Sequence, residues 1–369
     1  MRVLHFYKTS LPDSIGGVEQ FISQLSRGMG AYGIQAEVLS LAKNPVPLTI
    51  KQDGYETHRA KLTFQIASTG FSIPVFSQFT ELVKQADIIH YHFPWPFMDI
   101  VHFATQVKKP TVLTYHSDII RQKYLFKLYR PLMNKFLGSV DKIVATSDNY
   151  LSTSKILENY KDKTRVIPIG LDKATYPHAS YEKMDYWRTK LGSKFFLFIG
   201  MIRYYKGLHI LLNAMASMDY PLVILGTGPE EEALKLQASK LGLKHIHFLG
   251  YLPEEDKAAL LTLCYSLVFP SYLRSEAFGI GLLEGAMYGK PMISCEIGTG
   301  TSYINISELT GLVVPPDDPQ ALQQALRYLW EHPEVAAEMG HQAKMRYQNL
   351  FQAKHMIKSY ADLYKELNN

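Results

Sequence analysis

The sequence predicts an α/β protein built from two doubly wound, parallel sheets, and three observations lead to this fold class. Short apolar runs typical of buried strands alternate with helical patterns along nearly the whole chain. This alternation favours parallel strands joined by helices. The chain has 369 residues, too many for one comfortable core, so two domains are expected. Residues 173–187 are rich in tyrosine and lack periodicity, and we expect the linker there.

In the first half of the chain, a glycine pair separates the first strand from the first helix. Gly16 and Gly17 follow the strand expected at residues 3–7, and a helical pattern begins at Phe21. A tight turn alone would also explain the two glycines. Further strands are expected at residues 36–41, 87–91, 111–115, 141–146 and 164–169, and helices at residues 75–86, 97–107 and 150–160.

The second half repeats the alternation. Strands are expected at residues 195–199, 222–225, 246–249, 267–270 and 292–295, and helices at residues 208–215, 257–263, 282–287 and 320–329. Asp317, Asp318 and Pro319 predict an N-terminal cap for the last of these helices. Residues 334–367 read as one more helical stretch.

Composition indicates an ordinary globular protein, with 47% hydrophobic and 20% charged residues. Cys264 and Cys295 lie in apolar runs, so we expect buried thiols in a reduced compartment rather than a disulfide. The apolar run at the N-terminus is too short for a signal peptide, and no stretch approaches the length of a membrane span. We therefore expect a cytoplasmic protein, or one attached to a membrane from its cytoplasmic side.

The net charge of +5 is concentrated in residues 1–169. A basic half suggests an anionic partner, either a membrane surface or a phosphate-bearing substrate. We find no nucleic-acid-binding motif and expect no nucleic-acid partner.

One basic segment, residues 121–136, has apolar side chains at three-and-four spacing and no acidic residue. This pattern predicts an amphipathic helix, with Pro131 as a point where it could kink. A helix packed on the core and a helix attached to anionic lipid both fit the pattern. Its basic residues are Arg121, Lys123, Lys127, Arg130 and Lys135.

The most informative stretch is residues 275–284, which joins the strand at 267–270 to a helix. Gly279 and Gly281 leave the loop backbone bare, and N–H groups at a helix N-terminus form a site for phosphate. Two carboxylates, Glu276 and Glu284, could hold hydroxyl groups beside that phosphate. A surface loop with two solvated glutamates is the alternative.

Other candidate residues also follow predicted strands, where parallel sheets bind ligands. They are His116 and Ser147 in the first half, and Arg203, Lys206, Gly226 and Gly228 in the second. Each has a plain structural explanation, since a lone histidine is more often structural and Lys and Arg are usually solvated. The sequence around Gly226 is not a dinucleotide fingerprint, because Glu231 stands where the third glycine belongs.

These motifs resemble a known family. Glu276 and Glu284 within Ser-Glu-Ala-Phe-Gly…Glu, followed by Gly-Lys-Pro at residues 289–291, resemble the signature of glycosyltransferase family 4. Residues 295–303 look similar to bacterial mannosyltransferases that build O-antigen and related lipopolysaccharide chains. The resemblance covers almost the whole chain. It implies the GT-B fold, in which two Rossmann-like domains face each other across a cleft.

The resemblance also implies the domain bounds and their roles. Residues 1–172 would form the acceptor-side domain, and residues 173–351 the domain that binds the nucleotide sugar. Residues 352–369 would form a helix that crosses back onto the first domain.

Site roles follow from the same resemblance. Glu276 would hold hydroxyls of the transferred sugar, Glu284 the ribose, and His116 the sugar from the opposite domain. Arg203 and Lys206 would hold the donor diphosphate, and the catalytic set would be Glu276, His116, Arg203 and Lys206. Further donor contacts would come from Gly16, Gly17, Gly226 and Gly228, and from the loop residues Phe278, Gly279 and Ile280.

The sequence contains no Asp-x-Asp motif and no Cys/His cluster with metal-ligand spacing. We therefore expect neither metal nor cofactor, and expect fixed positive charge to stabilise the leaving diphosphate. The resemblance implies a retaining transfer, most simply of mannose from GDP-mannose to a saccharide or a polyprenyl-linked glycan. A GDP-deoxyhexose or UDP-sugar donor, and a nucleotide-sugar epimerase of the same fold, remain alternatives. A catalytically inactive binding protein is disfavoured by the presence of both glutamates, Arg203 and Lys206.

Overall fold

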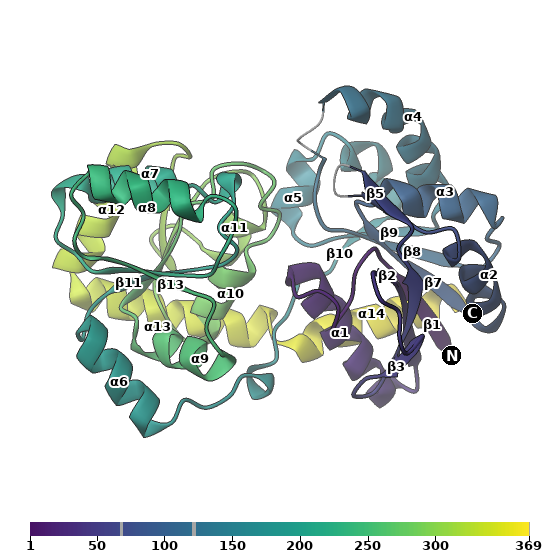
Figure 1. The fold of residues 1–369 in the computed structure, drawn as a ribbon, viewed down its shortest axis with the longest axis horizontal. Coiled ribbons are helices and arrows are strands. Elements are labelled where there is room, and N and C mark those ends of the chain that lie inside the picture. Colours follow the sequence, from purple (N-terminus) through teal and green to yellow (C-terminus); the bar gives the residue numbers. More distant parts are fainter. Residues whose placement is uncertain (67–68, 120–122, 369) are drawn as a thin grey trace. The chain divides into compact units, whose positions relative to one another are not determined.

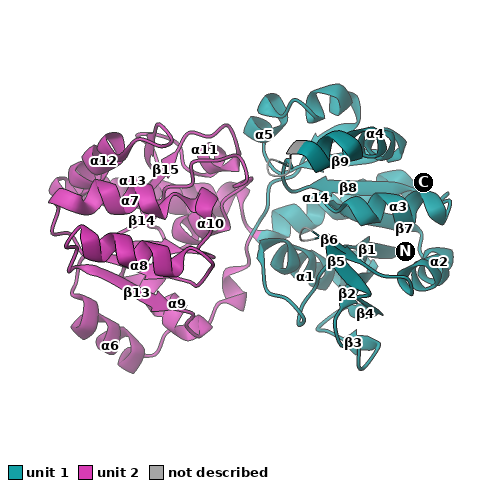
Figure 2. Cartoon of the chain, turned by 45° about the horizontal axis from the view of Figure 1, so that its top comes forward, with its two compact units in different colours: residues 1–170, 353–369 teal, residues 171–352 magenta. Residues whose placement is uncertain are grey.

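The computed structural model describes residues 1–66, 69–119 and 123–368, and the chain divides into two compact units. Unit 1 comprises Met1–Gly170 and Ala353–Asn369, and unit 2 comprises Leu171–Gln352 (Figure 2). The chain therefore leaves unit 1 once and returns to it for its last helix.

Unit 1 is built on an eight-stranded sheet in the order β10-β9-β8-β7-β1-β2-β4-β3. All neighbouring strands are parallel except β3, which runs antiparallel to β4. A separate hairpin is formed by β5 and β6. The strands are β1 (Arg2–Phe6), β2 (Gln35–Ala42), β3 (Thr49–Lys51), β4 (Glu56–Lys61), β5 (Phe64–Ile66), β6 (Thr69–Phe71), β7 (Ile88–Phe93), β8 (Thr111–Tyr115), β9 (Lys142–Ala145) and β10 (Thr164–Val166).

Helices connect these strands, and the last helix of the chain, α14 (Ala353–Asn368), packs beside α1 in unit 1 (Figure 1). Gly28 of α1 lets the two helices approach, since a Cβ there would lie 2.3 Å from Ile357 Cδ1. The buried Tyr360 and Tyr364 fix α14 to the sheet. The other helices of unit 1 are α1 (Gly17–Met29), α2 (Val75–Gln85), α3 (Pro96–Ala104), α4 (Lys123–Ser139) and α5 (Asp148–Thr153).

Unit 2 is built on a six-stranded parallel sheet in the order β13-β12-β11-β14-β15-β16. Its four central strands are buried along their whole length and are apolar except for Ser266 and Ser294, as expected for a sheet covered on both faces. The strands are β11 (Phe196–Ile199), β12 (Leu222–Leu225), β13 (Ile246–Gly250), β14 (Ser266–Phe269), β15 (Met292–Cys295) and β16 (Gly311–Val314).

The helices of unit 2 surround this sheet (Figure 1). Asp318 begins α12 by accepting hydrogen bonds from the backbone N–H groups of Gln320 and Ala321, so the predicted cap is confirmed. The helices are α6 (Tyr181–Leu191), α7 (Leu208–Ala214), α8 (Glu231–Lys240), α9 (Glu254–Leu263), α10 (Ile280–Met287), α11 (Gly300–Ile304), α12 (Pro319–Glu331) and α13 (Pro333–Leu350).

Three predicted elements differ from the structure. The expected linker, residues 173–187, contains most of α6, which buries only Trp187 and Leu191 and so has too little apolar periodicity to detect. The expected helix at 150–160 ends at Thr153, and a 3₁₀ segment follows. The helical stretch 334–367 is two helices, because Phe351 and Gln352 break it where the chain returns to unit 1.

Both sheets have a switch point, where strand order reverses and ligands bind in open α/β folds. In unit 2 it lies between β11 and β14, and in unit 1 between β1 and β7. The candidate residues follow these strands or their neighbours. Among the described helices, none is both long and apolar enough to cross a membrane.

Candidate functional site

Lys206 and Glu276 form a buried ion pair at the switch point of unit 2. Lys206 follows β11 and Glu276 follows β14, and these strands are neighbours. The Lys206 Nζ atom donates a hydrogen bond to Glu276 Oε2, and the two residues are only 9% and 8% exposed. Two predicted site residues 70 positions apart are thus brought into contact.

The surroundings of this pair hold both groups in place. Ser271 Oγ lies 3.4 Å from Glu276 Oε2, and Lys206 Nζ lies 4.5 Å from the centre of the Phe269 ring. A buried charge is tolerated only when it is paired and hydrogen-bonded, so each group requires the other. An ammonium group has three N–H donors, which leaves Lys206 able to bind a further oxygen.

Arg203 lies in the same loop but is exposed. It precedes the short 3₁₀ turn Tyr204–Lys206, and its Nε atom donates to Met201 Sδ at 2.9 Å. The guanidinium group is therefore placed at the surface beside the Lys206 loop, with its fork of donors available to a ligand.

The two predicted donor-binding glycines after β12 have a packing role. A Cβ on Gly226 would lie 2.1 Å from the carbonyl oxygen of Gly200, and one on Gly228 would lie 2.1 Å from that of Ile202. The backbone N–H of Ile202 donates to Thr227 O at 2.9 Å. These glycines therefore fasten the loop after β12 to the loop that carries Arg203.

The N-terminus of α10 opens directly after Glu276. Gly279 caps this helix with φ +98°, a left-handed conformation that favours glycine. Phe278 is buried against Phe351, so a ligand would meet its backbone rather than its ring. The first N–H groups of α10 lack partners within the helix, which makes them donors for an anion.

Arg274 was missed by the sequence analysis. Its Nη1 atom donates to the carbonyl oxygen of Gly298 at 2.6 Å, which ties the loop before Glu276 to the loop after β15. The sequence did offer a signal for Arg274, because this residue lies two positions before Glu276 in the same loop. The loop after β15 is held further by Glu296, whose carboxylate accepts bonds from the Gly298 N–H and the Ser302 hydroxyl.

Glu284 lies on α10 as predicted but is 4% exposed and belongs to a different set of contacts. Its Oε1 atom accepts a hydrogen bond from the Tyr176 hydroxyl at 2.9 Å and lies 3.1 Å from Lys257 Nζ. Burial alone would lower the pKa of Lys257, but the charges of Glu284 and Glu254 outweigh it and raise this pKa to about 12. In the described part of the chain, the recorded contacts of the Glu284 carboxylate involve Oε1, so Oε2 remains for a ligand.

In unit 1, His116 follows β8 and is 8% exposed. Burial lowers its pKa to about 3, so the imidazole is neutral near pH 7. Its Nε2 atom lies 3.1 Å from His92 Nδ1, and its ring packs on Phe21. Ser147, the other strand-end residue, caps α5 by accepting from the N–H of Tyr150, which is a structural role.

The loop with Gly16 and Gly17 is held by Glu19, which the sequence analysis also missed. Glu19 is buried and accepts hydrogen bonds from Thr9 Oγ1 at 2.8 Å and Ser14 Oγ at 3.0 Å. A Cβ on Gly16 would lie 2.5 Å from Glu19 Oε2, so the glycine makes room for this carboxylate. The acidic residue in the first turn of α1 was the available signal.

One group of side chains in the described chain could hold a metal ion by proximity: His5, His90 and His92, whose ligand atoms lie within 4.8 Å of one another. Both ring nitrogens of His90 are in hydrogen bonds, with Tyr364 Oη at 2.6 Å and Thr114 Oγ1 at 2.7 Å. A metal ion would have to displace one of them. Hydrogen bonding therefore explains the group better than metal binding.

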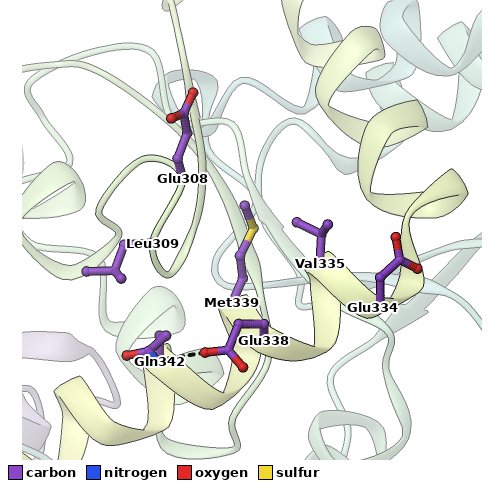
Figure 3. Close-up of a pocket in the computed structure, with 7 residues that line it drawn as sticks. All are labelled: Glu308, Leu309, Glu334, Val335, Glu338, Met339 and Gln342. Carbon is purple, nitrogen blue, oxygen red and sulfur yellow. Dashed lines mark hydrogen bonds between the residues drawn. The ribbon is translucent and has the colours of Figure 1, made fainter.

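A surface hollow of about 330 Å³ lies on α13, lined by Glu308, Leu309, Glu334, Val335, Glu338, Met339 and Gln342 (Figure 3). Glu308 and Leu309 precede β16, so the hollow lies at the amino ends of the parallel strands. Lys206 and Glu276 follow the carboxyl ends. This hollow is therefore separate from the candidate site.

The basic segment forms helix α4, which continues through Pro131; Arg121 lies outside the described residues. Met133, Phe136 and Leu137 anchor its second half in the core. In its first half the apolar Tyr124 and Leu128 are 87% and 81% exposed. These two apolar side chains therefore do not pack on the core.

Comparison with known proteins identifies both halves of the chain. The model of the family described as Glycosyltransferase Family 4 matches residues 15–175, and that described as Glycosyl transferases group 1 matches residues 182–346.

Two relatives match along nearly their whole length. The D-rhamnosyltransferase WbpZ of Pseudomonas aeruginosa is 61% identical over 353 residues, which are 96% of this chain and 93% of that protein. The O-antigen chain mannosyltransferase C of Escherichia coli is 48% identical over 373 residues, which are 100% of this chain and 99% of that protein.

Among solved structures, sucrose-phosphate synthase from Thermosynechococcus elongatus superposes with a TM-score of 0.81 at 21% identity. The match covers 99% of this chain and 98% of that one. It shows a common fold, and the predicted GT-B class with two Rossmann-like domains is confirmed.

Proposed function

The chain belongs to glycosyltransferase family 4, and from this premise we propose that it transfers a sugar of mannose configuration from a GDP-linked donor to a growing O-antigen glycan. The two relatives described above are named for D-rhamnosyl and mannosyl transfer. D-Rhamnose is mannose without the 6-hydroxyl group. The sequence motifs favour mannose, whereas the 61% identical relative favours the 6-deoxy sugar.

The observation that supports the proposal most strongly is the buried pair of Lys206 and Glu276 at the switch point of unit 2. We assign Lys206 and Arg203 to the donor diphosphate, together with the N–H groups that begin α10. Glu276 would accept hydrogen bonds from sugar hydroxyls, and Oε2 of Glu284 would accept one from the ribose. Unit 2 is thus the proposed nucleotide-sugar domain.

The proposed reaction retains the configuration at the anomeric carbon. The bond from this carbon to the diphosphate oxygen breaks, and a bond to an acceptor hydroxyl oxygen forms on the same face. The leaving phosphate takes the proton of the acceptor hydroxyl. Glu276 is not assigned as a covalent nucleophile, because its carboxylate is held by Lys206 and Ser271.

Fixed charge replaces a metal ion in this proposal. As the bond breaks, negative charge grows on the diphosphate, and preorganised donors aimed at that charge lower the barrier. Lys206 is already held in place by Glu276, so little reorganisation is needed.

Unit 1 is the proposed acceptor-side domain. We assign the neutral His116 to a hydroxyl or phosphate oxygen, because an uncharged imidazole can still donate one hydrogen bond. The exposed Tyr124 and Leu128 of α4, with Lys127 and Arg130 beside them, would attach unit 1 to an anionic membrane that holds a lipid-linked acceptor.

A panel of GDP, UDP, GDP-mannose, GDP-D-rhamnose and UDP-glucose tests the donor. A ligand at about 100 times its dissociation constant raises the free energy of unfolding by about 2.7 kcal/mol, so thermal unfolding reveals the preferred nucleotide. We expect GDP compounds alone to stabilise the protein, and one GDP-sugar to yield a glycan. Stabilisation by UDP compounds, or an altered nucleotide sugar formed without acceptor, would contradict the proposal.

A further inference from the structure

Three histidines form a hydrogen-bonded row in the core of unit 1. His5 Nδ1 lies 3.1 Å from His92 Nε2, and His92 Nδ1 lies 3.1 Å from His116 Nε2. The row crosses the sheet because β1, β7 and β8 are neighbours, with His5 and His92 one residue before the ends of β1 and β7 and His116 just after β8. It connects the innermost histidine to the one assigned to the ligand.

The protons in this row are not independent. Burial lowers the pKa of His5 and His116 to about 3 and that of His92 well below its usual range, so each ring is neutral and has one N–H. Each of the two nitrogen contacts needs one proton between its atoms. Only two arrangements satisfy both contacts: all three protons on Nδ1, or all three on Nε2.

The inner end of the row distinguishes the two arrangements. His5 Nε2 is buried and has no hydrogen-bond partner in the described part of the chain. With all protons on Nε2, an N–H group would be left there without an acceptor, and buried N–H groups without partners are rarer than unpaired acceptors. With all protons on Nδ1, His5 Nε2 is an unprotonated acceptor, and only its lone pair lacks a partner. An isolated imidazole favours the Nε2–H tautomer. The row would therefore hold His116 in the Nδ1–H tautomer, which is the less populated form of a free histidine side chain.

We propose that His92 and His5 are positioning residues that keep the proton of His116 on Nδ1, so that this nitrogen donates a hydrogen bond to an oxygen of the saccharide or phosphate. The inference rests on the proposed function for the role of His116. Within the described residues, no hydrogen-bond partner is recorded for His116 Nδ1, which leaves this atom for a ligand.

His90 supplies a matched control within the same cluster. Its ring lies 4.4 Å from that of His92 and is equally buried, but its nitrogens bond to Tyr364 and Thr114. Replacing it disturbs the core without entering the row. A structural role of the cluster and a role in setting the tautomer can therefore be separated.

The direct test is nitrogen NMR of the full chain labelled in its 13 histidines, with signals assigned by single substitutions. We expect His5, His92 and His116 all to be protonated on Nδ1. A mixture of tautomers among the three would overturn the coupling, and protonation of all three on Nε2 would overturn its direction. One tightly bound metal ion per chain with shifted His5 and His92 signals would also overturn it.

Substitutions at His92 and His90 test whether the tautomer of His116 affects the rate of sugar transfer. In His92→Leu, His116 should revert to Nε2–H and kcat should fall about 10- to 100-fold, by analogy with the loss of residues that orient metal-binding histidines. His92→Asn places an amide N–H near the former Nδ1 and should restore Nδ1–H and part of the rate. His90→Leu should lower stability but leave the His116 tautomer and most of kcat unchanged.

Equal losses of kcat in His92→Leu and His90→Leu, with an unchanged His116 tautomer, would contradict the proposal. If His92→Leu does not fold, His92→Asn and the wild-type spectrum still decide the matter. The NMR measurement of the tautomer does not depend on enzymatic activity. Absence of transfer from every donor would therefore refute the proposed function alone, and a wrong tautomer would refute the positioning role alone.

Discussion

The charge of the buried Lys206 is stabilised by its ion pair with Glu276, whereas the exposed Arg203 needs no buried partner. The first is 9% exposed and paired, and the second lies at the surface. Removing one partner of a buried ion pair leaves an uncompensated charge and costs about 3 to 5 kcal/mol. Substitutions at these two sites therefore affect stability differently, even if both residues bind the same diphosphate.

We predict that Arg203→Ala folds as the wild type does and that its kcat falls on the order of 100-fold, as when one donor to a developing anion is lost. Lys206→Ala should lose at least as much activity and also unfold at a lower denaturant concentration. Initial rates and urea unfolding of the same preparations measure both effects. Lys235→Ala in α8, which removes two surface ion pairs, is the control and should change neither. Near-normal kcat in both site variants would refute the assignment.

Buried histidines make the stability of unit 1 depend on pH. Burial lowers the pKa of His5 and His116 from 6.5 to about 3, so between these values the unfolded chain binds more protons than the folded one. Their contribution to stability is present above pH 6.5 and is lost as the pH falls, by about 1.4 kcal/mol per pH unit for each histidine.

We therefore predict a lower urea midpoint at pH 5.5 than at pH 7.5. In His5→Phe the difference between the two midpoints should be smaller, because one histidine no longer contributes. The same midpoint at both pH values would show that these histidines are protonated in the folded protein.

Among the elements, the sequence analysis identified the buried apolar strands well, but it identified polar strands and weakly amphipathic helices poorly. β11 and β12 are wholly apolar, and β14 and β15 each contain a single serine among apolar residues, which leaves a clear signal. The strands β3 to β6 carry polar or exposed residues, and the sequence analysis did not detect them. Their pairing is decided by neighbouring strands rather than by their own composition.

Helix α4 has a second half that packs on the core and a first half with exposed apolar and basic side chains. Its second half is anchored by Met133, Phe136 and Leu137, of which the sequence analysis placed only Phe136 in the apolar pattern. Its first half exposes Tyr124 and Leu128 beside basic residues, an arrangement suited to the boundary of an anionic membrane. Binding of α4 to lipid would depend both on its basic residues and on the exposure of Tyr124 and Leu128.

We predict that the protein sediments with anionic vesicles at low salt and that Lys127→Gln with Arg130→Gln weakens this binding. Each basic residue near the surface contributes about 1 kcal/mol, so the double variant should bind roughly 30-fold less. Leu128→Gln should weaken binding further. Lys155→Gln with Lys161→Gln removes the same charge from another exposed part of unit 1 and should have little effect. Equal binding by all variants would eliminate α4 as the contact.

For the whole molecule, the fold class and the signature loop could be predicted, because parallel α/β units leave alternating patterns and Glu276 lies in a recognisable motif. The contact between Lys206 and Glu276 could not be derived from spacing, since strand order brings them together across 70 positions. The histidine row was missed for the same reason. His90 and His92 share one face of β7, but only the pairing of β7 with β1 and β8 joins them to His5 and His116.

We propose that fixed protein charge, with no metal ion, supports sugar transfer from a GDP-linked donor. The most direct test is the initial rate of transfer of labelled mannose or D-rhamnose from its GDP donor to a lipid-linked glycan, with and without excess EDTA. We predict a labelled glycan and an initial rate that EDTA leaves largely unchanged. A rate that falls to background with EDTA and returns with magnesium or manganese would contradict the account.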